Sequence, residues 1–239
     1  MTPTPTVPTQ VAAAPVSAIV AVRDGAAFVT DAIESILDQT RRPRQVIVVD
    51  DGSTDATPAI LASFQPVIEV VRIQPSGLSR ARNVALERAT QPFLGFCDAD
   101  DLWLPEKTAL QVAALEADPG LAGVFGAIDE FTDLAAGDEH AAVRAPNVGV
   151  RARMSQTLLA RTTSFDRAGP FDPEVSGAEF IEWLARAESR GLRFAEIADV
   201  VARRRIHGGN TTMDPAWRAH LARTMKLVME HHRGAATTD

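Results

Sequence analysis

Three carboxylates follow directly on an apolar run in the stretch FLGFCDADDLWLPEKT, residues 93–108. Like charges as close as Asp98, Asp100 and Asp101 repel one another unless a positive group lies among them. Because side chains alternate along an extended segment, Asp98 and Asp100 are expected on the same side. Carboxylates and an anionic diphosphate together form the oxygen-rich surroundings that hard divalent cations prefer, here Mg²⁺ or Mn²⁺. The simpler alternative is that one of the three, Asp101 before the others, caps the helix that follows.

Asp50 and Asp51 form a second acidic pair, in VVDDGSTD (48–55). A carboxylate can accept a hydrogen bond from the N3–H of a uracil or thymine ring, which only an acceptor can do. The alternative is that both are solvated turn residues before Gly52. A turn accounts for the glycine, but it does not account for two adjacent like charges.

Two arginines, Arg80 and Arg82, begin a predicted helix in SRARN (79–83). Guanidinium groups and helix N-termini both favour phosphate. At a spacing of two residues the pair cannot share a helix face. One arginine is therefore expected to point to a nucleotide and the other to solvent.

A basic cluster, Arg203, Arg204, Arg205 and His207, precedes the sequence GGNTT. Arginines on a strand alternate faces, so at most two of the three can point at one cleft. The glycines permit a loop that closes over a bound ligand, with His207 reaching a diphosphate or a metal. The alternative is a purely structural histidine.

The composition restricts the classes of function. The chain has 239 residues, 46% of them hydrophobic and 23% charged, with a formal net charge of −7. Nucleic acid is not expected as a partner, because phosphate backbones are bound through an excess of Lys and Arg. No run of 18 apolar residues occurs, so no membrane span is expected. The N-terminus lacks the basic and apolar regions of a signal peptide, and a single cysteine, Cys97, suits a reducing compartment. A cytoplasmic protein is expected.

The first half of the sequence alternates between short apolar runs and segments of helical periodicity. The apolar runs predict buried strands at 17–22, 45–50, 68–73 and 93–97. The periodic segments predict helices at 26–40, 53–64, 77–89 and 106–117. Ser53 or Thr54 is placed to cap the second of these helices. This alternation predicts an α/β fold with a mainly parallel central sheet and helices on both faces, and ligands of such sheets lie outside the carboxyl ends of the strands.

The second half predicts a smaller, mixed region. Strands are expected at 122–128, 155–160 and 200–206, helices at 180–192 and 216–232, a long loop at 132–150 and a turn-rich connection at 164–175. The alternating prolines of residues 1–15 predict a disordered Thr/Pro tail.

Three common nucleotide folds are excluded by their motifs. A dinucleotide-binding fold needs G-x-G-x-x-G after the first strand, where this chain has VRDGAAFV with one glycine. A P-loop, G-x-x-x-x-G-K-[ST], does not occur. A phosphatase with an aspartyl nucleophile would carry D-x-D after the first strand, whereas here D-x-D follows the fourth.

Five motifs in order resemble the family 2 glycosyltransferases of the GT-A fold. They are VDDGSTDAT, GLSRARNVALERA, FCDADDLWLPEKTALQ, GPFDPEV, and GAEFIEWLARAESRGL followed by RRRIHGGN. The resemblance covers roughly residues 16–212. It implies a nucleotide-sugar-binding half at 16–128 and an acceptor-binding half of the same domain at 129–212. A C-terminal helix and tail are expected at 213–239 from the sequence pattern.

The resemblance also implies roles for single residues. It makes Asp100 the main metal ligand, with His207 as a second, and places Asp98 near the ribose. Asp51 would accept the N3–H of the base, and Arg82 would be the arginine at the nucleotide. The full set expected at the nucleotide sugar is Ala21, Arg23, Asp24, Asp50, Asp51, Arg82, Asp98, Ala99 and His207.

The chain departs from the family pattern at its first motif. The family usually has Pro, an aromatic residue and Asn where this chain has Ala21, Arg23 and Asp24. Tyrosine is absent from the whole sequence, so an aromatic stack on the nucleotide base is missing at that point.

The catalytic base is expected at the start of the helix at 180–192. The family carries an acidic pair there, with the second acid as base, and the matching positions are Ala178 and Glu179. Glu182 lies three residues on and on the same side of a helix. It is expected to be a solvated or salt-bridged residue, with Arg186 as its partner.

The resemblance implies a metal-dependent, inverting glycosyltransferase. Its donor would be a nucleoside diphosphate sugar, UDP- or dTDP-linked, and its unidentified acceptor a small molecule, a glycan or a peptide. One alternative is a sugar-phosphate nucleotidyltransferase, which needs a Gly-rich basic loop after the first strand, where RDGAAF is poor in both. Another is a nucleotide-sugar-binding module without a catalytic base.

Overall fold

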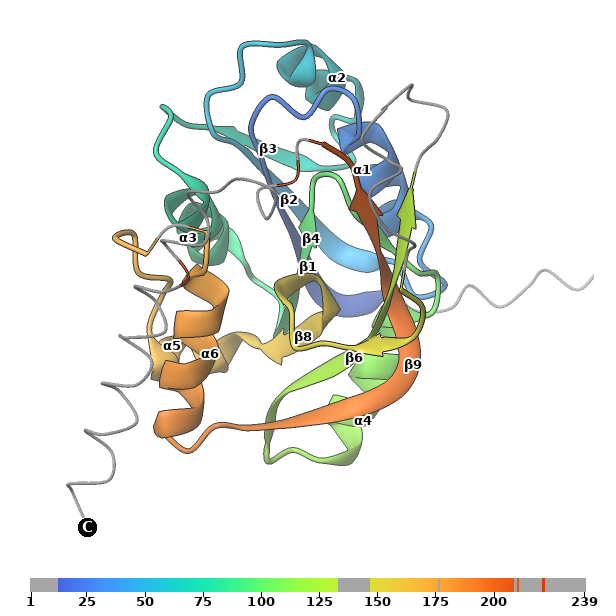
Figure 1. Ribbon diagram of the computed structural model, residues 1–239, viewed down its shortest axis with the longest axis vertical. Helices are drawn as coiled ribbons and strands as arrows, with labels where there is room; N and C mark the ends of the chain where they lie inside the picture. Colours follow the sequence, from blue (N-terminus) through green and yellow to red (C-terminus); the bar gives the residue numbers. More distant parts are fainter. Residues whose placement is uncertain (1–12, 133–146, 176, 209, 211–220, 222–239) are drawn as a thin grey trace, which may run out of the picture.

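The computed structural model of the chain describes residues 13–132, 147–175, 177–208, 210 and 221. Figure 1 shows a twisted central sheet with helices packed on both of its faces. In the first half the elements are β1 (Ala14–Val22), α1 (Val29–Leu37), β2 (Pro43–Asp50), α2 (Thr57–Ser63), β3 (Glu69–Arg72), α3 (Leu78–Arg88), β4 (Phe93–Asp98), β5 (Leu102–Trp103) and α4 (Lys107–Ala117). In the second half they are β6 (Leu121–Thr132), β7 (Val150–Arg151), the 3-10 turn η3 (Ser155–Thr157), β8 (Leu158–Arg161), α5 (Thr162–Ala168), α6 (Glu179–Ser189) and β9 (Arg193–Ile206).

The sheet has a parallel part and a mixed part. Its strand order is β3-β2-β1-β4-β8-β6-β9-β5, with β7 paired to β6. Strands β3, β2, β1 and β4 are mutually parallel. Beyond β4, β8 is antiparallel to both of its neighbours, whereas β6 and β9 are parallel. The predicted α/β fold is confirmed, and the carboxyl ends of β1 and β4 lie side by side, with Ala21 opposite Asp98.

Alternation along β1 sends apolar side chains to two cores. Ile19 belongs to a core under α3, α5 and α6, whereas Ala18 and Val20 belong to a core under α1 and α2. A third group of buried residues packs α4 against β1, β4 and β8. Because helices cover both faces of these strands, each strand of the first half has a continuous apolar sequence.

An aromatic cluster fixes α6 against the end of β4. The rings of Phe165 and Trp183 stack with centroids 4.1 Å apart, and Phe96 of β4 contacts Phe165 edge-on at 5.8 Å. The indole N–H of Trp183 donates to the carbonyl of Gly169 at 3.0 Å. Such pairs add to the burial of their area, so the first turn of α6 is held close to the strand that ends at Asp98.

Several sequence predictions about elements are corrected. β1 starts at Ala14, inside the stretch expected to be a tail, and the expected turn-rich connection contains α5. The segment expected to be a strand at 155–160 begins with the 3-10 turn η3. The short strands β5 and β7 were not predicted. Apart from Leu221, the predicted helix at 216–232 lies outside the described residues, as does most of the predicted loop at 132–150.

No helix in the described ranges is long and apolar enough to cross a membrane.

Lys107, the first residue of α4, places an amine in the interior. Its side chain is fully buried and its Nζ donates to Gln111 Oε1 at 2.8 Å and to the carbonyl of Leu158 at 3.4 Å. The Nζ also lies 5.1 Å from the centre of the Trp103 ring. Burial lowers the pKa of Lys107 from 10.5 to about 7.

This pKa shift predicts a stability that rises with pH. Above pH 7 the unfolded chain still binds the proton that the folded chain has released, so the free energy of unfolding increases until the unfolded amine also titrates. Cys97 has the opposite effect: burial raises its thiol pKa, so the thiol ionises only in the unfolded chain above about pH 9. From pH 7 to 8.5 the wild type should therefore gain about 1.5 kcal/mol relative to Lys107→Met. Urea denaturation at both pH values measures the gain, and equal slopes for the two proteins would contradict it.

Candidate functional site

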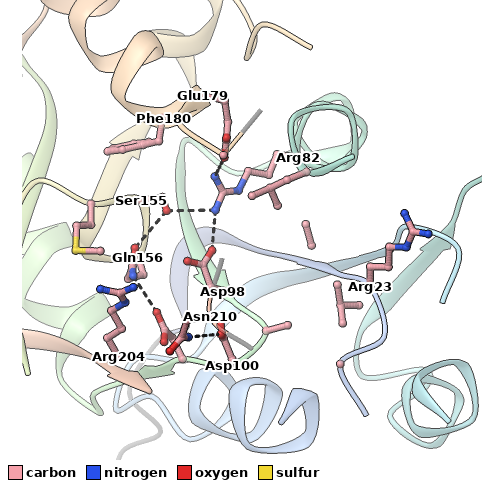
Figure 2. A pocket seen from close by; sticks show the side chains of 18 of the residues that line it. Arg23, Arg82, Asp98, Asp100, Ser155, Gln156, Glu179, Phe180, Arg204 and Asn210 are labelled. Atoms are coloured by element: carbon pink, nitrogen blue, oxygen red, sulfur yellow. Dashed lines mark hydrogen bonds and ion pairs between the residues drawn. The ribbon is translucent and has the colours of Figure 1, made fainter. Parts of the chain in front are cut away.

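A cavity of about 660 Å³ opens at the carboxyl ends of β1 and β4. Its walls come from both halves of the chain, as Figure 2 shows. They include residues of the loop after β1, the turn after β4, the segment before η3, the start of α6 and the end of β9. The position matches the expectation that ligands of such sheets lie beyond the strand ends.

The acidic motif after β4 forms a tight turn. The strand ends at Asp98, and the backbone N–H of Asp101 donates to the Asp98 carbonyl at 3.0 Å. Asp98 and Asp100 both line the cavity and are about one-third exposed. They share the cavity as predicted, although a turn, and not an extended segment, brings Asp100 there.

Asp101 does not cap the next helix, so that alternative is wrong. Its side chain is 2% exposed and accepts hydrogen bonds from the backbone N–H of Arg205 at 2.9 Å and from Nε2 of Gln156 at 2.8 Å. Burial, and then the nearby charges of Asp98 and Asp100, raise the pKa of Asp101 well above its usual value. Asp101 therefore ties β9 to the end of β4.

Asp100 meets the C-terminal end of β9. Its Oδ2 lies 3.0 Å from His207 Nε2 and accepts from Asn210 Nδ2 at 3.2 Å. Asn210 also accepts the backbone N–H of His207 at 2.7 Å and donates to the Arg205 carbonyl at 3.1 Å. The His207 ring packs against Phe28, with centroids 4.7 Å apart. Asn210 thus holds the predicted metal pair together.

Asp100 and His207 are the two residues predicted to bind a cation, and both line the cavity. No group of three or more His, Cys, Asp or Glu within the described part of the chain could hold a metal by itself. Mg²⁺ commonly keeps several waters and binds through one or two carboxylates together with substrate phosphates. A pair of protein ligands at the mouth of a cavity is consistent with that mode.

Arg82 is the arginine of its pair that enters the site, and Arg80 is exposed. The Arg82 side chain is 4% exposed, and its Nη2 donates to Asp98 Oδ1 at 2.6 Å and to Ser155 Oγ at 3.2 Å. Its Nη1 donates to Glu179 Oε1 at 2.6 Å. Figure 2 shows the guanidinium between the two carboxylates. Burial raises the pKa of Asp98, although the charge of Arg82 opposes the shift.

Glu179 opens α6, with Ala178 as the N-cap residue. Its carboxylate is 3% exposed, lines the cavity, and has one oxygen, Oε2, without a hydrogen-bond partner among the described residues. The helix dipole stabilises a carboxylate in the first turn. Glu182 is buried and bonded through both oxygens to Arg186, at 2.8 and 2.9 Å, as predicted for a salt-bridged residue.

The loops after β1 and β2 are bonded to each other. Asp24 has a left-handed backbone, with φ of 50°, a conformation that aspartate adopts more readily than most residues. Its Oδ1 accepts the backbone N–H of Thr54 at 2.7 Å, and this hydrogen bond lowers the pKa of Asp24. Ser53 Oγ accepts the N–H of Asp24 at 2.9 Å. The predicted cap role of Ser53 or Thr54 is therefore wrong, and α2 begins at Thr57.

The remaining residues that were predicted to contact the nucleotide sugar divide into two groups. Ala21, Arg23, Asp24 and Ala99 line the cavity.

Asp50 and Asp51 do not line the cavity, and both are buried, so they are not solvated turn residues. Asp51 accepts the N–H and the hydroxyl of Ser76 at 2.7 and 3.0 Å and the N–H of Gly77 at 2.9 Å. Asp50 accepts the N–H of Ser53 at 2.8 Å. The pair therefore anchors the loops that follow β2 and β3.

Only one of the three consecutive arginines of β9, Arg204, lines the cavity. Arg203 stacks on Phe131 at 4.4 Å. Arg205 is buried, donates to the Asp100 carbonyl at 3.1 Å and pairs with Asp31 at 2.7 Å. Alternation along the strand separates them, as predicted.

Residues 17–167 match the family model described as "Glycosyl transferase family 2". The chain belongs to this family. As a family 2 glycosyltransferase it is 27% identical over 201 residues to the amylovoran biosynthesis glycosyltransferase AmsE of Erwinia amylovora, which covers 77% of this chain and 73% of AmsE. It is 37% identical over 89 residues to TuaG of Bacillus subtilis, a protein whose name refers to teichuronic acid biosynthesis. That match covers 36% of this chain and only 35% of TuaG.

The fold of this family 2 glycosyltransferase is also that of a solved structure. S. aureus TarS (residues 1–349) in complex with UDP-GlcNAc superposes with a TM-score of 0.72 at 21% identity. The match covers 90% of this chain and 66% of that chain. The two proteins share the GT-A-like architecture expected from the motifs.

Sequence reasoning missed Ser155, Gln156, Asn210 and Arg153 as cavity residues of this glycosyltransferase. Ser155 and Gln156 lie in a segment that was expected to be a strand, and that expectation did not indicate that their side chains line a cavity. Asn210 follows the two glycines after His207, and its position in GGN is the one feature that could have indicated it.

Removing the Asp51 carboxylate should destabilise the fold. Asp51→Ala leaves the N–H groups of Ser76 and Gly77 without their acceptor, which should lower the free energy of unfolding by roughly 1–3 kcal/mol. Asp55→Ala is the matched control, because its carboxylate also accepts backbone N–H groups but is exposed. Urea denaturation of both variants measures the difference. Equal losses would show that burial of the Asp51 hydrogen bonds does not matter.

Proposed function

We propose that this family 2 glycosyltransferase transfers a sugar from a UDP- or dTDP-linked donor to an acceptor nucleophile with inversion, in the presence of Mn²⁺ or Mg²⁺. One observation carries the proposal. The cavity that contains Asp98 and Asp100 also contains a buried carboxylate oxygen, Glu179 Oε2, that has no partner among the described residues. A buried acceptor atom without a donor is costly, and the O–H of an acceptor substrate would satisfy it.

The donor diphosphate would lie beside Asp100 and His207, which would hold the cation. When bound there, the cation would neutralise the charge of the leaving diphosphate. Asp98 begins the same turn and lines the same cavity, so its carboxylate would contact the donor ribose. The structural neighbour TarS is solved with UDP-GlcNAc, which supports a uridine nucleotide as the first donor to test.

Asp51 keeps one acceptor position for a base. A carboxylate has about four lone-pair sites, and the protein fills two on Oδ1 and one on Oδ2. A uracil or thymine N3–H could use the last. This supports the proposed role, although it requires the base to approach the loop at Ser76 and Gly77.

Glu179 would act as the general base. The acceptor hydroxyl would donate to Oε2 and transfer its proton there as its oxygen bonds to the anomeric carbon. The bond from that carbon to the diphosphate oxygen breaks with its electron pair, so the nucleoside diphosphate leaves from the opposite face. Attack and departure on opposite faces invert the anomeric centre.

A product assay tests the proposal. The wild type is incubated with Mn²⁺ and UDP-GlcNAc, UDP-glucose or dTDP-glucose, with water as the acceptor, and the products are identified by mass spectrometry. Release of UDP or dTDP is expected. Pyrophosphate released from a nucleoside triphosphate and a sugar phosphate would instead identify a nucleotidyltransferase. Donor binding without release of any product would identify a binding module.

Asp100→Ala should remove the part of donor binding that depends on the cation. Isothermal titration of UDP-GlcNAc with and without Mn²⁺ should show metal-dependent binding in the wild type and no dependence in the variant, because the carboxylate that faces His207 is lost. Thermal unfolding checks that the variant is folded. Full activity of Asp100→Ala in the presence of a chelator would exclude a metal role for this residue.

Glu179→Gln and Glu182→Gln should separate the base from its neighbour. Loss of a general base typically lowers the rate by about 10²–10⁴-fold, and this drop should appear in Glu179→Gln with donor affinity nearly unchanged. Glu182→Gln should keep the rate and lose stability only, because Glu182 is bonded to Arg186. Rates of UDP release decide between them. A drop confined to Glu182→Gln would reverse the assignment.

A further inference from the structure

Arg82 lines the cavity, but its guanidinium is bonded to the proposed base. Its guanidinium reaches Glu179 from one end and Asp98 and Ser155 from the other. The faces of Phe96 and Phe171 lie 5.5 and 5.8 Å from the guanidinium carbon. Two aromatic faces and two carboxylates thus determine both the plane and the position of the group.

This setting is unsuited to a diphosphate ligand. A phosphate that bound Arg82 would have to enter a position that is 96% shielded, since the side chain is 4% exposed. It would also have to displace Asp98 or Glu179, each held at 2.6 Å. If Glu179 were displaced, its buried carboxylate would be left without its counter-charge, which is strongly unfavourable.

We infer that Arg82 is a positioning residue for Glu179, in place of the nucleotide contact that the family resemblance implies. This inference rests on the proposed function. By binding Oε1, Arg82 determines that Oε2 is the oxygen left for the acceptor, and it holds the carboxylate in one rotamer.

The same guanidinium links the base to the donor side of the cavity. Arg82 belongs to α3, Asp98 to β4 and Glu179 to α6. Asn83, the next residue of α3, exchanges two hydrogen bonds with the backbone of Phe171, at 2.8 and 2.9 Å. The helix that carries Arg82 is therefore bonded to the segment that precedes α6, in addition to the direct contact of Arg82 with Glu179.

The test separates donor binding from the chemical step. Arg82→Lys keeps a positive charge, but one ammonium group cannot reproduce the two-ended guanidinium contact. With UDP-GlcNAc, Mn²⁺ and water as the acceptor, its kcat for UDP release should fall about tenfold or more, towards the loss expected for a missing base. Its donor Kd by isothermal titration should stay within about twofold of the wild type. Arg82→Met should lose more of kcat than Arg82→Lys, since it has no charge to rescue the base.

Arg186→Lys is the matched control. Arg186 forms the neighbouring arginine–glutamate pair on the same helix, with Glu182, but neither residue lines the cavity. Arg186→Lys should change the thermal stability of the protein without changing kcat. If Arg82→Met does not fold, Arg82→Lys decides the question by itself. A donor Kd weakened tenfold or more at unchanged kcat would overturn the inference and restore a nucleotide contact. Wild-type protein that releases no UDP or dTDP from any donor would instead refute the proposed function, and the base role with it.

Discussion

Negative charge at the end of a buried strand is the constraint on which the site depends. Asp98 ends β4 and is about one-third exposed, whereas Asp101 in the turn that follows and Glu179 at the start of α6 have little access to water. Charges in such surroundings must be paired, because the cost of removing a carboxylate from water is several kcal/mol even after relaxation. Two buried arginines bind these acids, one through its guanidinium and the other through its backbone N–H. Arg82 pairs with Asp98 and Glu179, and Arg205 donates its backbone N–H to Asp101 and its side chain to the Asp100 carbonyl and to Asp31.

The rest of the architecture brings these two cations to the acids. Arg82 arrives on α3, whose Ala81 and Ala85 pack on the core face shared with α5 and α6. Arg205 arrives on β9, which runs beside β6 and then pairs with the short strand β5 directly after the acidic turn. The stacked pair of Phe165 and Trp183 sets the distance from α6 to β4. Helix packing and strand order thus bring the two arginines beside the acidic turn.

Local sequence patterns predicted the helices, the strands and the contacts between residues that are close together in the chain. Short continuous apolar runs located the buried strands and period-3.6 patterns located most helices, and the spacing of Glu182 and Arg186 predicted their ion pair. The topology rule for parallel sheets then predicted that the residues after β1 and β4 share one cavity. α5 was missed because it has only seven residues and continues into a Gly- and Pro-rich connection.

The contacts that complete the site could not be predicted, because they join residues far apart in the chain. Gln156 bonds to Asp101 across 55 residues and Asn210 to Asp100 across 110. Polar residues in a loop or a short turn have no periodic sequence pattern that would indicate which distant residue they bind. Ser53 and Thr54 show the same limit: a helix cap was the plausible local role, but their hydrogen bonds go to Asp24, about thirty residues away.

The position of β9 has a consequence for the order of folding. The parallel part of the sheet is built from residues 14–98, so it can form while a ribosome is still adding the second half of the chain, since domains fold from the N-terminus as they are made. The hydrogen bonds of Asp31 and Asp101 with Arg205 can form only later, because Arg205 follows them by 174 and 104 residues in the chain. Contacts across such separations form late and slowly. The contacts that close the pocket around Asp100 and Asp101 therefore form only after residues 205 and 210 have emerged.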